Sequence, residues 1–594
     1  MKAFKKLNIF LILYVCFLFI YVLLRAFYLE PLHDEVATFI HYIETGKIIG
    51  NDIVLDANNH FINSYWGRFM FVCFGENYFN FRLLSVISFL FYAIGIWRLC
   101  NLTLKDNINK VLLFIGLISI PWILDYFSYT RGYATAITCF IWAIYFLLQF
   151  IHSKKLSSFF WMAVLLILTL ASNLIYVSSS ILLIAFAFGF FLFFISNKSL
   201  VYSFKFYGIL FLLILGIVPF LLFSFDLKEA GALYYGSLNG FWKVTLKSLS
   251  KNVLFIDFYW LKYVFYIAGM LMIFLIYLKY RKETFSKIIQ KPIALFLYLL
   301  LGNVLMIYSF AKILGINYPE DRAGMYLIPI SFFLISIFFE TFSKQFYHYL
   351  FLFFPLSLFI NLNLTTSIFS PEDRMSKDFY SKVRKQIKSD EALSVYPIQG
   401  LTYSSLEKSN EHHKHIAKSQ KFLSPYTDFV ITKKSMLFPK KNLKYYKEIA
   451  YHVESNHVAF RRKVPFKKEL IFDSIFEDKT INDEFILFFD GQIDSTLKKY
   501  PIQLTLEGLL TVLGTINTMN LVISTENKQH VVERYDCINL RWYYGNSIQD
   551  KSIYFPNPGI KFNYNDNYLK IYLWNPDHLK VKLKNTKILF YQLK

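Results

Sequence analysis

Long apolar runs fill this sequence from residue 8 to about residue 364, and they constrain its fold more than any other feature. The first run, from Leu7 to Leu29, is long enough to cross an apolar layer of about 30 Å as a helix. Over the whole chain 55% of residues are hydrophobic and 18% are charged, against about 25% charged in soluble proteins. The pattern predicts a helical membrane body and excludes a wholly soluble or disordered chain.

About eleven segments are predicted to span the membrane. The first is interpreted as an uncleaved anchor, because it lacks a small-residue cleavage site. Lysine and arginine gather in alternate loops, which is the signature of the cytoplasmic side. We therefore expect a multi-pass protein of the plasma (inner) membrane, with its C-terminal region outside the cytoplasm. The other predicted spans lie near residues 81–102, 110–125, 132–152, 157–172, 174–196, 204–225, 259–279, 292–312, 325–341 and 346–365.

The last part of the chain alternates polar and apolar residues as soluble folds do. Short strands before residue 466 indicate a small α/β unit, and later strands between Asn, Asp, Gly and Pro turns favour a β-sandwich, interpreted as carbohydrate-binding-like. The expected fold is a polytopic α-helical membrane protein with a C-terminal extracytoplasmic α/β unit and β-sandwich. Its predicted domains are 1–366, 367–466 and 467–594.

The net charge and the spacing of the cysteines limit which partners and metal sites the sequence predicts. The net charge is +22, but the basic residues are scattered among apolar ones, which disfavours nucleic acid. The five cysteines show no CxxC spacing, so neither a disulfide framework nor a zinc site is predicted. The stretch from Glu411 to His415 could bind a metal or form a solvated loop. His60 with Asp34 and Glu35 could hold a divalent metal, although their spacing does not demand one.

The first outer loop, residues 30–80, carries the densest polar cluster. Asp34 and Glu35 follow the first span directly, and carboxylates at a membrane edge carry a desolvation cost. One interpretation makes Asp34 a general base and Glu35 its neighbour that shapes charge or binds substrate. The other makes the pair an N-terminal helix cap. Further along, Asn58, Asn59 and His60 could bind hydroxyl or phosphate oxygens, or could bond their own loop.

Four cations are predicted at the outer membrane boundary, where positive charge is depleted. They are Arg82, Arg131, Lys312 and Arg322. A lipid-linked phosphate would satisfy them, and arginine can grip phosphate oxygens with two parallel hydrogen bonds. The alternatives for any single residue are snorkelling or pairing with a nearby acid. A polyprenyl-phosphate sugar needs cations for its departing phosphate, while a carboxylate takes the acceptor's proton.

With these residues, the sequence resembles the GT-C superfamily of polytopic glycosyltransferases. Within this superfamily it is similar to the branch of protein O-mannosyltransferases and lipid A aminoarabinose transferases. The resemblance covers about the first 365 residues. No β-trefoil-like repeat follows, in contrast to the protein O-mannosyltransferases. The stretches that carry it are His33-Asp34-Glu35, Asn58-Asn59-His60-Phe61-Ile62-Asn63-Ser64, Phe81-Arg82-Leu83-Leu84-Ser85, Arg131-Gly132-Tyr133, and Asp321-Arg322 ahead of Tyr326-Leu327-Ile328-Pro329.

The resemblance implies an inverting transfer from a polyprenyl- or dolichyl-phosphate sugar to an extracytoplasmic hydroxyl of a glycan, lipid or protein. The family's acidic residue matches Asp34 as base, with Glu35 beside it, and its phosphate-binding residues match Arg131 and Arg322. The lipid-phosphate set is completed by Lys312 and Arg82, and substrate binding is assigned to Asn58, Asn59, His60 and Tyr133. Residue usage resembles that of low-GC bacteria, which favours undecaprenyl phosphate as carrier.

Two other classes of function remain open from sequence. A transporter or flippase of lipid-linked glycans with a glycan-binding tail would use the same charges to line a path. In such a protein we expect ionisable residues near the middle of the membrane spans, whereas in this sequence the ionisable residues gather near one membrane edge. A membrane-anchored binding or assembly protein would not need the edge arginines.

Overall fold

The computed structural model describes residues 2–50, 53–195, 200–258, 260–342, 345–368, 370–388, 390–409, 418–419, 423–434 and 440–594. The chain forms two compact units. The first comprises residues 1–29 and 46–369, and the second comprises residues 30–45 and 370–594. The segment from Glu30 to Thr45, inside the predicted first loop, therefore belongs with the C-terminal residues rather than with the helices that flank it in sequence.

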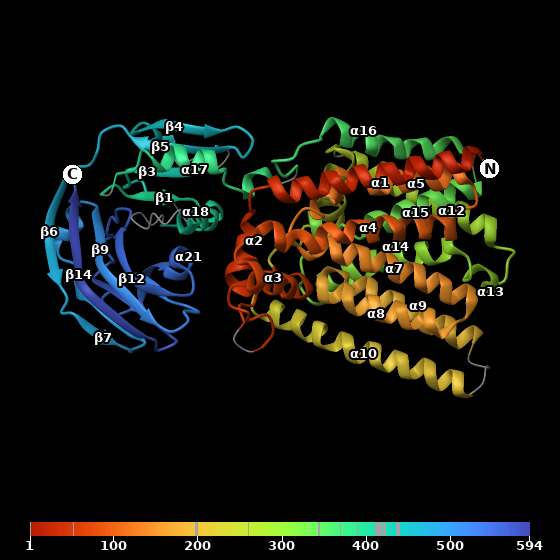
Figure 1. Ribbon diagram of the computed structural model, residues 1–594, viewed down its shortest axis with the longest axis horizontal. Helices are drawn as coiled ribbons and strands as arrows, with labels where there is room; N and C mark the ends of the chain where they lie inside the picture. The colour runs from red at the N-terminus through yellow and green to blue at the C-terminus, as the bar shows by residue number, and fades with distance from the viewer. Residues whose placement is uncertain are drawn as a thin grey trace. The chain divides into compact units, whose positions relative to one another are not determined.

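The first unit is built of helices, and α4, α7, α8 and α10 lie side by side in it (Figure 1). Its α-helices are α1 (Lys2–Tyr28), α3 (Phe61–Phe74), α4 (Tyr78–Thr103), α5 (Asn107–Ile118), α6 (Pro121–Tyr126), α7 (Gly132–Ser153), α8 (Leu156–Ser172), α9 (Val177–Phe194), α10 (Leu200–Glu229), α11 (Lys247–Leu254), α12 (Leu261–Tyr280), α13 (Phe285–Ile288), α14 (Pro292–Ile313), α15 (Leu327–Phe342) and α16 (Phe353–Ile360). Its other helical turns are the 3-10 helices η2 (Leu174–Tyr176), η4 (Asp321–Gly324) and η5 (Gln345–Leu352) and the π-helix η3 (Trp242–Leu246).

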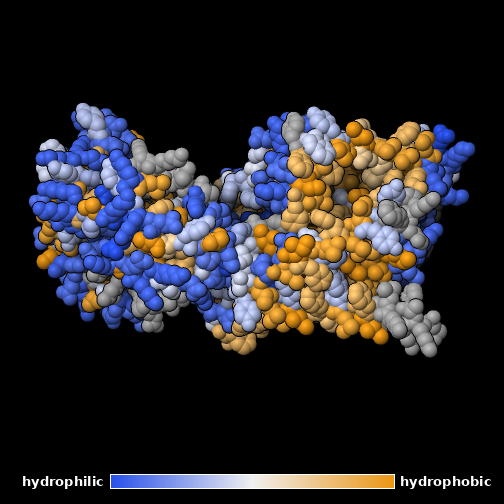
Figure 2. Space-filling model, turned by 90° about the horizontal axis from the view of Figure 1, so that it is seen from above, coloured by the Kyte–Doolittle hydropathy of each residue, from blue (hydrophilic) through white to orange (hydrophobic). Residues whose placement is uncertain are grey.

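The described residues contain seven helices long and apolar enough to cross a membrane, and four shorter apolar helices. Every predicted span except the one at residues 110–125 coincides with one of these helices to within several residues. On the face drawn in Figure 2, the surface of this unit is largely hydrophobic. Large apolar side chains of the unit, such as Phe193 and Phe204, are exposed. Such a surface suits lipid rather than water. The chain is thus a multi-pass membrane protein, and the count of about eleven spans stays a prediction.

One predicted span is divided in the structure. The run expected at residues 110–125 forms α5 and α6, which are separated at Ser119 and Ile120. Pro121 occupies the first turn of α6. Proline has no N–H and fits the first turn of a helix, so the apolar run ends one helix and starts another. The expectation of one continuous helix was wrong, and the break places Asp125 and Tyr126 on a short helix of their own.

The α/β part of the second unit has a five-stranded sheet with the order β2-β1-β3-β5-β4. The β1 strand is parallel to β2 and β3, and β5 is antiparallel to β3 and β4. Buried Phe379 and Tyr380 pack with the sheet residues in one core. The elements are η6 (Pro371–Asp373), α17 (Lys377–Arg384), β1 (Leu393–Val395), α18 (Pro397–Ser409), β2 (Lys418–Ser419), β3 (Phe429–Lys433), α19 (Lys440–Leu443), β4 (Tyr446–His452) and β5 (His457–Arg462).

The rest of the second unit consists of two antiparallel sheets that share one apolar core, as a β-sandwich does. Their strand orders are β11-β10-β13-β8 and β12-β9-β14-β6, with β7 paired to β14. The elements are β6 (Lys468–Ile475), β7 (Lys479–Ile481), β8 (Phe485–Gln492), α20 (Ser495–Lys499), β9 (Ile502–Leu513), β10 (Asn520–Glu526), β11 (Val532–Asn539), α21 (Leu540–Tyr544), β12 (Ile548–Pro556), β13 (Tyr568–Trp574) and β14 (Lys580–Leu593).

Two helical turns from the early sequence complete this unit. They are α2 (His33–Thr38) and the π-helix η1 (Phe39–Ile43). Most of their residues are buried, including Glu35, Val36 and Tyr42. The segment packs against α18, so the C-terminal unit supplies its surroundings.

Candidate active site

Arg131 stands at the start of α7, directly after the turn that follows α6. It is the N-cap residue of α7, with an extended backbone, and its side chain is 3% exposed. Its guanidinium carbon lies 5.6 Å from the centre of the Tyr133 ring. The Tyr133 ring in turn lies 5.0 Å from the ring of Tyr126 and 5.4 Å from that of His60. The buried Arg131 cation therefore lies against Tyr133, whose ring contacts two further rings.

Arg322 comes from a distant part of the sequence, the short helix η4 before α15. Its guanidinium carbon lies 4.8 Å from the centre of the Tyr235 ring. The neighbouring Asp321 fixes this turn: it accepts hydrogen bonds from the Tyr235 hydroxyl at 3.0 Å and from the Asn252 amide at 2.8 Å. Its backbone N–H donates to the Ser248 hydroxyl at 2.9 Å. The acid thus holds the loop that carries the arginine.

Tyr126 connects the two arginines. Burial raises the pKa of its hydroxyl, and the charges of Arg322 and Arg131 both act in the opposite direction. Burial is also the largest cause that raises the pKa of Tyr235. The charge of Arg322 acts to lower this pKa, and the nearby Tyr126 acts to raise it. The helix α11 packs against both α6, which carries Tyr126, and η4, which carries Arg322. The structure therefore brings Arg131 and Arg322 to one aromatic cluster in the helical unit.

The polar stretch before α3 is divided between loop structure and this cluster. The Asn58 backbone and amide both bond to Asp56. The Asn59 amide donates to the Ile48 carbonyl at 2.9 Å and accepts from the Ser64 hydroxyl at 3.2 Å. These contacts favour the loop interpretation for Asn58 and Asn59. His60 differs, because its ring faces Tyr133 while its Nδ1 lies 3.1 Å from the Ser172 carbonyl.

The two remaining predicted cations have other surroundings. Arg82 is 1% exposed and donates to the carbonyls of Ala26 and Leu29 at 3.0 and 2.7 Å, near the C-terminal end of α1. That geometry satisfies carbonyls that a helix end leaves open. Lys312 is exposed on α14 and lies over the ring of Tyr308 at 5.9 Å. Both contacts favour a structural role over phosphate binding.

A buried ion pair that the sequence did not predict lies next to Tyr126 of the aromatic cluster. Arg25, near the end of α1, pairs with Asp125, the neighbour of Tyr126, and both side chains are almost fully buried. Asp125 also accepts from the Ile368 backbone at 2.9 Å, and Arg25 donates to the Asn363 carbonyl at 2.6 Å. The pair joins α1, α6 and the segment after α16. A lone arginine inside the first apolar run was the available signal.

Asp34 and Glu35 lie in the first turn of α2, within the second unit. Glu35 is buried, and its carboxylate accepts from the Leu32 backbone N–H at 3.2 Å. Glu35 thus makes a capping contact, but the N-cap residue of α2 is Leu32 and not Asp34. Asp34 is half-buried, and its carbonyl accepts from the Thr38 hydroxyl at 2.8 Å. The meeting of Asp34 with Arg131 and Arg322 stays a prediction.

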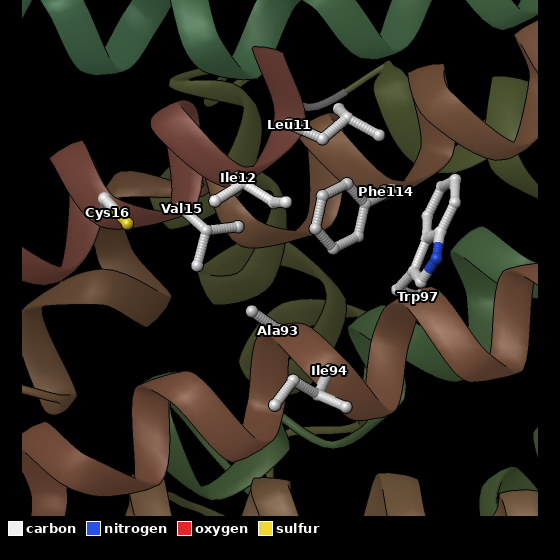
Figure 3. Close-up of a pocket in the computed structure, with 8 residues that line it drawn as sticks. All are labelled: Leu11, Ile12, Val15, Cys16, Ala93, Ile94, Trp97 and Phe114. Atoms are coloured by element: carbon white, nitrogen blue, oxygen red, sulfur yellow. The ribbon is translucent and has the colours of Figure 1, made fainter. Parts of the chain in front are cut away.

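An apolar pocket of about 380 Å³ lies elsewhere in the helical unit, between α1, α4 and α5 (Figure 3). Its lining contains none of the site residues discussed above. A lipid chain would suit such walls, but the pocket does not identify a path to the arginines. It is lined by Leu11, Ile12, Val15, Cys16, Ala93, Ile94, Trp97 and Phe114.

No group of three or more His, Cys, Asp or Glu residues suited to a metal occurs in the part of the chain that the structure describes. The predicted metal stretch Glu411–His415 lies outside the described residues. In the sandwich, Tyr543 and Tyr544 have rings that could stack on a sugar, but both are buried in the shared core. Core packing is the interpretation that their burial favours.

Comparison with known proteins gives matches among solved structures alone. No family model and no curated protein matches the chain. ArnT from Cupriavidus metallidurans, in the apo state, is 11% identical over 77% of this chain and 98% of its own, with a TM-score of 0.33. ArnT bound to undecaprenyl phosphate is 9% identical, with the same coverage and TM-score. Arabinofuranosyltransferase AftD from Mycobacteria is 7% identical over 98% of this chain and 58% of its own, with a TM-score of 0.34. With identities of 7–11% and TM-scores of 0.33–0.34, these matches assign neither a family nor an activity to this chain.

Proposed function

We propose that this membrane protein is a glycosyltransferase. It moves a sugar from a polyprenyl-phosphate donor, of the undecaprenyl type, to a hydroxyl acceptor outside the cytoplasm, with inversion at the anomeric carbon. The observation that carries the proposal is the convergence of Arg131 and Arg322 on Tyr126 in the helical unit. Two guanidinium groups in a partly dry site suit a phosphate that gains charge as the sugar leaves.

In the proposed reaction, different residues act on the acceptor hydroxyl and on the departing phosphate. A bond forms between the acceptor oxygen and the anomeric carbon, while the bond from that carbon to the phosphate oxygen breaks. Asp34 accepts the hydroxyl proton, and Glu35 stabilises the helix that carries Asp34 through its contact with the Leu32 N–H. Arg131 and Arg322 take up the charge of the departing lipid phosphate. Tyr133 lies beside Arg131 and His60 lies beside Tyr133, and we assign both to binding of the sugar or its phosphate.

The distribution of charge along the spans disfavours the transporter alternative. In the seven long apolar helices that the structure describes, the central turns contain no Asp, Glu, Lys or Arg. Transporters place such residues near the midplane, where they line the substrate path. Charges near helix ends instead fit a reaction at headgroup depth.

Lipid-phosphate binding tests the cationic site directly. We expect Arg131→Gln and Arg322→Gln each to weaken binding of undecaprenyl phosphate to the purified chain in nanodiscs, by about tenfold or more, because each removes a charge-assisted contact. Lys312→Gln removes an exposed cation outside the cluster and is the matched control, with unchanged affinity. Wild-type affinity in both arginine variants would contradict the phosphate site.

Transfer and orientation need separate measurements. Asp34→Asn should abolish sugar transfer while leaving undecaprenyl phosphate binding intact. Mass spectrometry of envelope glycans from cells lacking the protein should reveal the missing sugar.

A reporter fused after Lys594 should be active only outside the cytoplasm. Cytoplasmic activity of the reporter would reverse the proposed orientation.

A further inference from the structure

The segment between the first two helices of the membrane body, residues 30–45, is fastened at both ends to the C-terminal unit. At its start, Glu30 accepts from the Arg374 guanidinium at 3.0 Å and from the Lys377 backbone N–H at 2.8 Å. Arg374 is 3% exposed, and Leu32 forms an isolated β-bridge with the same residue. The entry to α2 is therefore set by residues far along the chain.

At its end, Glu44 is held by two cations from different parts of the second unit. One carboxylate oxygen lies 2.8 Å from Lys408 Nζ, on α18, and the other lies 3.0 Å from Arg541, on α21. Glu44 and Arg541 are each about 95% buried. We call Glu44, Lys408 and Arg541 the Glu44 clamp.

The clamp also grips the backbone of the segment. Arg541 donates to the Ile40 carbonyl, which lies inside the π-helix η1 directly after α2. The Glu44 N–H bonds to the Phe39 carbonyl at 2.8 Å and closes that π-turn. Lys408 Nζ lies 5.1 Å from the centre of the Phe39 ring. Single π-turns are rare in helices and are frequent at functional sites.

A buried cluster of ion pairs fixes the geometry of the segment more than it raises the free energy of unfolding. Two buried opposite charges gain little net stability, since desolvation offsets their attraction, but removal of one partner is costly and the geometry is specific. Between the two fastened ends lie His33, Asp34 and Glu35. The backbone of α2 can neither slide nor rotate without breaking an ion pair at one end.

From this arrangement we infer that the Glu44 clamp positions the helix that carries Asp34. The C-terminal unit is then part of the catalytic apparatus, rather than only a module that selects the acceptor. Glu44, Lys408 and Arg541 are positioning residues that act through Asp34, and the inference rests on the proposed function of Asp34 as base.

Hydrogen exchange of the full chain in nanodiscs measures the clamp without any substrate. We expect Arg541→Gln to raise exchange of the amides of residues 35–44 at least tenfold, because the segment then opens locally. Arg541→Lys should restore part of the protection. The matched control is Arg461→Gln, which breaks a 2.9 Å pair with Glu391 in the α/β sheet and should leave residues 35–44 protected. Lys408→Gln, at a more exposed position of the clamp, provides a second variant should Arg541→Gln not fold.

Transfer kinetics then separate positioning from general structural damage. We expect Arg541→Gln to lower kcat by on the order of 100-fold, as small misplacements of a catalytic group do, with the donor KM changed less than about threefold. Unchanged exchange over residues 35–44 in both clamp variants, or an unchanged kcat in Arg541→Gln, overturns the inference. Absence of transfer by the wild-type chain would instead remove the proposed function, while the exchange data still decide whether the clamp holds α2.

Discussion

Arg25 and Asp125 form an ion pair inside the helical unit, with both side chains almost completely shielded from solvent. The pair joins the end of α1 to the short helix that carries Tyr126. Arg25 also donates to the Asn363 carbonyl, and the Ile368 N–H donates to Asp125, so the segment after α16 is fastened to the same point. The aromatic cluster around Arg131 and Arg322 thus depends on a buried charge pair that is not itself part of the cluster.

Breaking this pair from one side should be costly. We expect Arg25→Met to lower the free energy of unfolding by about 3–5 kcal/mol, because Asp125 would be left as a buried charge without its cation. The double variant Arg25→Met/Asp125→Leu should recover part of that loss. Denaturant titration in detergent measures both. Lys291→Met breaks a half-exposed pair with Glu283 and should change stability by less than about 1 kcal/mol. A loss equal to that of Arg25→Met would mean that burial is not the cause.

Arg82 provides a test that separates helix capping from phosphate binding. We expect Arg82→Met to destabilise the protein by about 1–3 kcal/mol, because the carbonyls of Ala26 and Leu29 lose their buried donor. Affinity for undecaprenyl phosphate should stay at the wild-type value in nanodiscs. Selective loss of lipid-phosphate affinity, with normal stability, would return Arg82 to the phosphate site that its sequence position suggested.

The sequence was sufficient for the positions of most helices and strands, since long apolar runs and short alternating ones determine them locally. The short strands expected before residue 466 are observed, for example at Leu393–Val395 and His457–Arg462. It was not sufficient for contacts between distant residues. Glu44 and Arg541 carry no local pattern that pairs them, and Arg25 is hidden in an apolar run, so only the folded chain reveals these partners.

The residue after Arg131 should tolerate no side chain. A Cβ atom on Gly132 would lie 1.8 Å from the Ser172 carbonyl oxygen and 2.9 Å from the His60 Cβ. We therefore expect Gly132→Ala to destabilise the protein by about 1–3 kcal/mol or more, as overpacking does, and to displace α7 from α8. Gly189→Ala on α9 has no atom within 4 Å of the added carbon and should be neutral or stabilising by up to about 1 kcal/mol. Thermal unfolding of the two variants in detergent compares them, and equal midpoints would contradict the close approach.

A buried histidine should make the α/β part of the second unit sensitive to acid. Burial lowers the pKa of His457 to about 4, from an ordinary value of 6.5, and its Nε2 lies 3.1 Å from the Glu372 carbonyl oxygen. Between pH 6.5 and 4 the unfolded chain binds a proton that the folded chain does not, so stability falls as the pH falls through this window. The loss amounts to about 3 kcal/mol, since each pKa unit is worth about 1.4 kcal/mol.

Oxidation of Met375 by hydrogen peroxide in increasing urea can follow this loss in the full chain, because Met375 is 2% exposed in the same core as the sheet. The urea midpoint of its oxidation should fall between pH 7 and pH 4 in the wild type. The neutral variant His457→Gln has no proton to gain, so its midpoint should fall less over the same range. Parallel midpoints in the two proteins would show that another group carries the acid sensitivity, because only the titration of residue 457 differs between them.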